Sequence, residues 1–111
     1  IAELSGLEIV SVNGSGPIGD LVETALEKAQ VEVREIISVG TYYIAAALVR
    51  FGSGVAIVDE FTARSMLSHG LDTIEISPEM RFGVHAIWLE DRPPSKLGLR
   101  FVKAIEEALQ K

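Results

Sequence analysis

The middle of the chain has a clear pattern of apolar and polar positions. Residues 33–39 are rich in β-branched side chains, residues 42–51 carry apolar side chains on more than one face, and residues 55–58 are all apolar. This pattern predicts a strand, a helix and a second strand, with a glycine turn at residues 52–54 that ends the helix. Strands that are apolar on both faces are typical of a parallel sheet covered by helices.

The residues before this unit predict another strand and helix. Residues 7–12 are a strand candidate, and Pro17 is preorganised for the first turn of a helix that extends to about Gln30. The apolar positions of this helix recur at three- and four-residue spacing, and they are Ile18, Leu21, Val22, Ala25, Leu26 and Ala29. The order of elements up to residue 58 is therefore β-α-β-α-β, which predicts an α/β fold.

Four further elements are expected after residue 58. Residues 61–68 predict a helix that stops at His69-Gly70, while residues 71–76 and 81–89 predict two strands. A last helix is expected from Ser95, a suitable N-cap, to about Gln110. Its apolar positions need a surface to be buried on, and they are Leu97, Phe101, Val102, Ala104, Ile105 and Leu109.

Length and charge narrow the function classes. The 111 residues are enough for one hydrophobic core and too few for two. The net charge of -6 would repel nucleic acid, so any DNA contact must come from elsewhere. The sequence has no membrane-spanning run or signal-peptide pattern. Because Ile1 is not an initiator residue, we expect a processed chain or an excerpt of a longer protein.

Residues 14–19 match the pattern G-x-G-x-x-G after a strand and at the start of a helix. In this context the pattern is compatible with dinucleotide binding, although no acidic residue stands at the end of the second strand. Two other interpretations stay open. The glycines can form a plain turn, or the helix N-terminus can bind an anion with the amide of Asn13 and the hydroxyl of Ser15.

Two other strand-to-helix corners carry polar residues with alternative roles. Thr41 is either the N-cap of the helix that begins near Tyr42 or a hydrogen-bond donor to a ligand. Asp59 is either a helix cap or a carboxylate that holds a cationic group of a ligand. The ring of Tyr42 can contact a ligand or pack in the core.

The sequence argues against catalysis and metal binding. His69 and His85 have no companions at metal-ligand spacing, and no Ser-His-acid set is present. The absence of cysteine excludes disulfides and thiolate metal sites. We therefore expect neither an enzyme nor a bound metal, and we expect no cofactor.

Three segments resemble a known family. Residues 48–58, Leu-Val-Arg-Phe-Gly-Ser-Gly-Val-Ala-Ile-Val, resemble a segment in the effector-binding domain of LysR-type transcriptional regulators. Pro93-Pro94-Ser95 followed by Phe101-Val102 is similar to the ending of that domain. Residues 59–63, Asp-Glu-Phe-Thr-Ala, are most similar to the branch that includes the lysine-biosynthesis and opine-catabolism regulators. The resemblance covers essentially the whole chain.

The resemblance implies a fold and a domain organisation. It implies a three-layer α/β domain with a mainly parallel sheet, of the flavodoxin or periplasmic-binding-protein type. Residues 1–87 would form the second regulatory subdomain. Residues 88–111 would form the end of a crossing strand and a helix that returns to a first subdomain, which this chain lacks. An orphaned apolar helix face favours self-association.

The resemblance also implies a role. Asn13, Ser15, Gly40 and Thr41 would supply polar contacts to a small effector, with Tyr42 and Asp59 as further candidates. The effector would be an amino acid or an opine-like carboxylate. The protein would be a bacterial, cytoplasmic homo-oligomer that binds DNA only through a helix-turn-helix domain outside this chain. The alternatives are a nucleotide-binding domain of an enzyme and a subdomain of a solute-binding protein.

Overall fold

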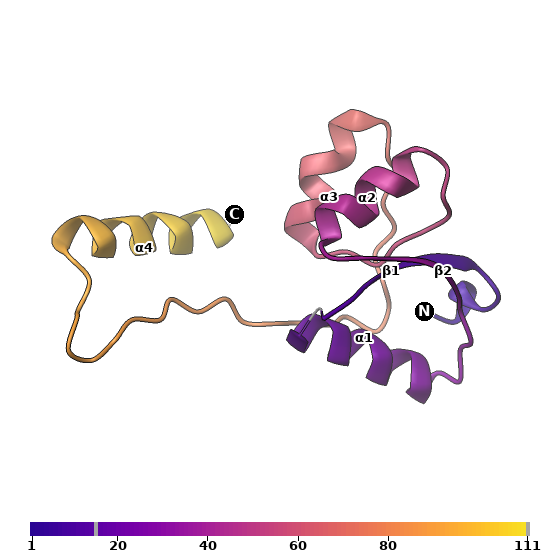
Figure 1. Ribbon diagram of the computed structural model, residues 1–111, viewed down its shortest axis with the longest axis horizontal. Helices are drawn as coiled ribbons and strands as arrows, with labels where there is room; N and C mark the ends of the chain where they lie inside the picture. The colour runs from indigo at the N-terminus through magenta and orange to yellow at the C-terminus, as the bar shows by residue number, and fades with distance from the viewer. Residues whose placement is uncertain (15, 111) are drawn as a thin grey trace.

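The computed structural model describes residues 1–14 and 16–110 (Figure 1). Its elements, in chain order, are η1 (Ala2–Leu4), β1 (Glu8–Val12), α1 (Gly16–Lys28), β2 (Arg34–Val39), α2 (Tyr42–Arg50), α3 (Glu60–Met66), η2 (Leu67–His69) and α4 (Lys96–Leu109). The α/β class is confirmed, and each predicted helix is present within two residues of its expected bounds.

The sheet consists of two parallel strands. β1 pairs with β2 from Glu8 opposite Arg34 to Val12 opposite Val39, with a register shift between Ile9 and Val10. On the other side of β1, Val55 forms a single parallel bridge with Ile9. The three parallel segments therefore lie in the order β2, β1, Val55, with β1 in the centre.

The predicted strand at residues 55–58 is wrong in its extent, because only Val55 pairs. The Val10 amide donates to the Val55 carbonyl at 2.9 Å, and the Val55 amide donates to the Glu8 carbonyl at 3.1 Å. Residues 56–58 then lead without ladder partners to Asp59, the N-cap of α3.

The core lies between β1, α2 and α3. Its buried apolar residues are Ile9, Val10, Ala45, Ala46 and Met66. The small side chains of the two alanines allow α2 to approach β1 closely. Helices α2 and α3 lie on one side of the strands and α1 on the other (Figure 1), but α1 has no buried residue. A packed three-layer domain with a larger sheet therefore stays a prediction.

The strands predicted at residues 71–76 and 81–89 are wrong, because both stretches lie outside the helices and strands of the described chain. Alternation of apolar and polar residues favours an extended backbone, whereas a strand also needs a neighbour that supplies hydrogen bonds. The segment instead runs beside α1. Phe82 lines a groove together with residues of α1, and its ring meets that of Phe61 of α3 edge to face, with 6.4 Å between the ring centroids.

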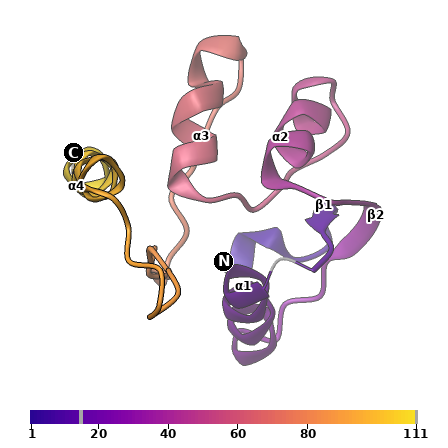
Figure 2. The same cartoon turned by 60° about the vertical axis from the view of Figure 1, so that its left-hand side comes forward.

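Helix α4 stands apart from the rest of the molecule (Figures 1 and 2). Its predicted N-cap is confirmed, since the Ser95 hydroxyl accepts a hydrogen bond from the Gly98 amide at 3.1 Å. The radius of gyration is 16.5 Å. A compact domain of this length would have about 13 Å, so the detached helix leaves the chain extended.

Candidate functional site

Two strand-to-helix corners meet at one edge of the sheet. Because β1 and β2 are parallel and Val12 pairs with Val39, both strands end at the same edge. The backbone N–H of Asn13 donates a hydrogen bond to the backbone carbonyl of Val39, with 2.8 Å between nitrogen and oxygen. The corner that precedes α1 is thus joined directly to the corner that precedes α2. Ligands of open parallel sheets bind beyond this carboxyl edge.

Thr41 caps helix α2. Its hydroxyl oxygen accepts a hydrogen bond from the Ile44 amide at 3.2 Å, and its backbone is extended, as an N-cap requires. This bond uses the hydroxyl as an acceptor only. A hydroxyl also has one hydrogen to donate, so the cap leaves that hydrogen available for a ligand beyond the corner.

Asp59 caps helix α3 with both carboxylate oxygens. One oxygen accepts from the Thr62 amide at 2.9 Å and the other from the Thr62 hydroxyl at 2.7 Å. The carboxylate is partly buried and already has two partners. Its capping role is therefore confirmed, and it holds this corner rigid at the start of α3.

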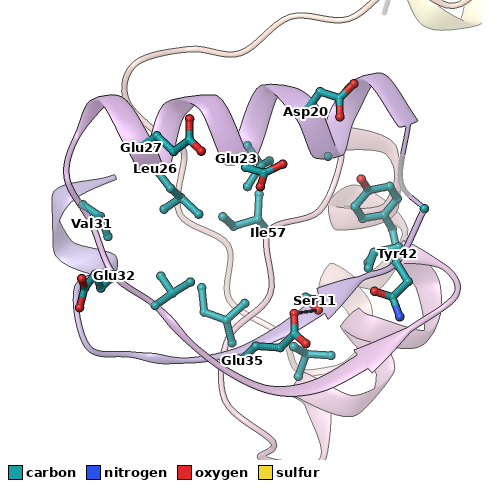
Figure 3. A pocket seen from close by; sticks show the side chains of 18 of the residues that line it. Ser11, Asp20, Glu23, Leu26, Glu27, Val31, Glu32, Glu35, Tyr42 and Ile57 are labelled. Carbon is teal, nitrogen blue, oxygen red and sulfur yellow. Dashed lines mark hydrogen bonds between the residues drawn. The ribbon is translucent and has the colours of Figure 1, made fainter.

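A groove of about 780 Å³ lies between α1 and the strands (Figure 3). Leu26 of α1 and Ile57 both lie in it, and Tyr42 lies at one end. Asn13 also lines the groove, whereas Gly40, Thr41 and Asp59 do not. Ser15, another candidate, lies outside the described residues. Among the candidates, the groove therefore brings together Asn13 and Tyr42.

The rim of the groove is acidic. Its charged lining residues are Asp20, Glu23, Glu27, Glu32 and Glu35, and within the described chain no lysine, arginine or histidine lines it. These carboxylates form no ion pair in the described part of the protein. The rim therefore attracts cationic groups, and a bound carboxylate would find its donors only at the corners.

A small polar cluster on the strands was not expected from the sequence. The Ser11 hydroxyl donates to the Glu35 carboxylate and lies 3.2 Å from the Ser38 hydroxyl. Ser11 and Ser38 are register partners on β1 and β2. The only signal in the sequence is that each serine precedes the last residue of its strand, and this becomes meaningful once the register is known.

A second groove, of about 970 Å³, lies on another face of α1 and is mainly apolar. Its lining residues include the acidic Asp20 and the basic Lys28 and Arg81, so charges of both signs line it. The Arg81 guanidinium donates a hydrogen bond to the Glu79 carboxylate, and this bond, with the Coulombic attraction of the pair, raises the pKa of Arg81 above its ordinary value.

Two further site classes find no support in the described chain. The described residues contain no group of three or more histidine, cysteine, aspartate or glutamate side chains that could hold a metal ion. Across the same residues, every helix is too short or too polar to cross a membrane.

Comparisons with known proteins agree on one family. The family model described as the LysR substrate binding domain matches residues 1–110. Over 90 residues the chain is 39% identical to the HTH-type transcriptional regulator DgcR of Pseudoalteromonas sp, and this match covers 81% of the chain and 31% of the relative. The chain thus spans about a third of that relative's length. No solved structure matches it.

Proposed function

We propose that this chain, which belongs to the LysR substrate-binding domain family, is the effector-sensing part of a bacterial transcriptional regulator. A 39% identical relative is named an HTH-type transcriptional regulator, which supports this role. The single observation that carries the proposal is the junction of two strand-to-helix corners at the carboxyl edge of β1 and β2, through the bond from the Asn13 amide to the Val39 carbonyl.

The proposed effector site is formed by these corners. The proposed residues are Asn13 and Ser15 of the first corner and Gly40, Thr41 and Tyr42 of the second, with Asp59 at the start of α3 as a further candidate. Amide groups at the N-termini of α1 and α2, together with the free hydrogen of the Thr41 hydroxyl, suit a carboxylate. The proposed effector is an amino acid or an opine-like carboxylate, as in the lysine and opine branch that residues 59–63 resemble. No covalent chemistry is proposed, and no metal or cofactor is needed.

The proposed domain organisation assigns residues 1–87 to the second regulatory subdomain. Residues 88–111 would return toward a first subdomain outside this chain, and the effector would bind between the two. The exposure of α4 supports this assignment, because an apolar helix face is stable when a partner covers it.

The proposed mechanism is a shift between conformations. An effector that binds a closed arrangement of the subdomains more tightly than an open one increases the closed population by its difference in affinity. In a homo-oligomer in the bacterial cytoplasm, this shift would change how helix-turn-helix domains outside this chain are presented to DNA. The net charge of -6 fits a sensor that does not itself contact DNA.

The test replaces Thr41 with valine in the full-length regulator. Valine keeps the shape and removes the hydroxyl, and a hydrogen bond to a charged group is worth about 1.5–3 kcal/mol, or roughly ten- to a hundred-fold in affinity. Effector-dependent transcription should therefore need a correspondingly higher effector concentration. Thermal unfolding of the same variant should fall slightly, because losing an N-cap costs about 1 kcal/mol.

Thr73→Val is the matched control, since Thr73 is exposed in the segment after η2 and belongs to neither corner. It should leave both induction and melting temperature unchanged. Normal induction of Thr41→Val with a lowered melting temperature would show that Thr41 is only a cap. Normal induction after Asn13→Ala as well would remove the side chains of both corners from the effector site.

A further inference from the structure

Helix α4 has one strongly apolar face that no other part of the described chain covers. Leu97, Phe101, Ile105 and Leu109 recur every four residues and lie on one side of the helix. None of them is buried, and the first two are 73% and 66% exposed. A face of this kind is rare on a stable monomer and marks a surface that needs a partner.

The groove between α1 and the strands matches this face in length and character. Its lining extends from Gly16 to Gln30 and so runs along the whole of α1, which is about 20 Å long at 1.5 Å per residue. Helix α4, from Lys96 to Leu109, is about 21 Å long. Val22, Leu26 and Ile57 give the groove an apolar floor.

The charges of the helix and the groove are complementary. Residues 96–103 of α4 carry Lys96, Arg100 and Lys103, and the acidic residues of the helix, Glu106 and Glu107, follow in its last turn. The groove is lined by five acidic residues and, within the described chain, by no basic one. The second groove is lined by charges of both signs, so the basic residues of α4 favour binding to the first groove.

The exposed surface is large enough for an interface. The chain exposes 8619 Å², whereas a compact protein of its size exposes about 6,000 Å². The excess, about 2,600 Å² per chain, is larger than the roughly 800 Å² that each partner contributes to a standard stable interface.

The path of the chain favours the groove of another molecule over its own. Ile18, Leu21 and Ala25 of α1 line the second groove together with residues of the segment 78–85, which precedes α4. Helix α1, about 10–12 Å wide, therefore separates this segment from the first groove. The connection at residues 86–95 would have to pass around α1 to place α4 there. A second copy meets no such obstacle.

We propose that the 111-residue chain forms a two-fold symmetric dimer in which α4 of each copy lies in the groove between α1 and the strands of the other. In the full-length regulator, the proposal above gives α4 a different partner subdomain. The proposed dimer, in which the two copies exchange their α4 helices, is therefore a property of the isolated 111-residue chain and does not depend on the effector role. In such a two-fold dimer each groove is filled by the helix of the other copy, so the assembly stops at two chains and does not grow into an open polymer.

Sedimentation equilibrium of paired variants tests the proposal. Phe101→Asp places a charge in the apolar face of α4, and each dimer contains two copies, so dimerisation should weaken by about a hundred-fold or more. Leu99→Asp makes the same change on the opposite side of α4 and should leave dimerisation nearly unchanged. Leu26→Asp in the groove should weaken it as Phe101→Asp does, with circular dichroism to check the fold.

Mixing distinguishes this dimer from other arrangements. Chains with Phe101→Asp and chains with Leu26→Asp should pair, because one helix and one groove remain intact in the mixed dimer. Dimerisation of Leu26→Asp alone at wild-type strength would mean that α4 pairs with α4 and would overturn the proposal. A wild-type chain that stays monomeric up to about 1 mM would overturn it too.

A crosslinking experiment covers the case in which Leu26→Asp fails to fold. The chain has no cysteine, so single cysteines can be introduced without background. A mixture of Ile105→Cys and Val22→Cys chains should oxidise to the mixed disulfide dimer faster than either chain alone forms its own. Equal rates for all three pairings would place α4 outside the groove and overturn the proposal.

Discussion

Replacing Gly54 with alanine should destabilise the fold more than the same change at Gly52. Gly54 has a φ of +114°, and an added Cβ would lie 2.6 Å from the backbone carbonyl oxygen of Glu8. That oxygen accepts the hydrogen bond from the Val55 amide at 3.1 Å. It therefore cannot move away without breaking the contact that joins this segment to β1.

The expected cost has two parts. Holding a residue other than glycine in a sparsely populated backbone region costs about 1–3 kcal/mol. Relief of the close contact sacrifices a backbone hydrogen bond, worth about 0.5–1.5 kcal/mol. The total is about 1.5–4.5 kcal/mol, a large share of the 5–15 kcal/mol by which a typical domain is stable.

Gly52→Ala is the matched control, because Gly52 has a φ of +86° and an added Cβ there would meet no atom within 4 Å. It should cost only the backbone term, which is about 1–2 kcal/mol for the left-handed region in which Gly52 lies. Urea unfolding followed by circular dichroism, at one protein concentration for all variants, gives both free energies of unfolding. Equal losses for the two variants would refute the argument that the approach to Glu8 limits residue 54.

Three further outcomes are expected. Asp59→Ala should lose about 1–2 kcal/mol of unfolding free energy, whereas Asp59→Asn should lose less because it keeps an acceptor for the Thr62 amide. Equal losses in urea unfolding would contradict the capping role. Ser95→Ala should reduce the helical circular dichroism signal of the dilute chain without shifting its main unfolding transition, because α4 stands apart from the core. A shifted midpoint would mean that α4 unfolds together with the core. Arg34→Gln should change the unfolding free energy by less than about 1 kcal/mol, because the side chains of Arg34 and its ion-pair partner Glu8 are 71% and 50% exposed. A larger loss would show that the pair is shielded from water.

The sequence by itself determined the local structure of this protein. The three- and four-residue spacing of apolar side chains, the caps at Thr41, Asp59 and Ser95, and the glycine at residue 70 are local signals, and the helices that they predict are present. The strands at residues 8–12 and 34–39 were likewise readable, since both are rich in β-branched residues. These features depend on contacts within a few residues, which sequence spacing records directly.

Only the tertiary structure decided which segments pair and what they enclose. The stretches at 55–58, 71–76 and 81–89 have strand-like patterns, yet pairing requires a neighbour in register, and only Val55 finds one. The bond from Asn13 to Val39, the Ser11 and Glu35 pair and the acidic groove each join residues far apart in the sequence. An apolar face such as that of α4 is visible in the sequence, but its partner is not, because burial depends on surfaces that the rest of the fold brings together.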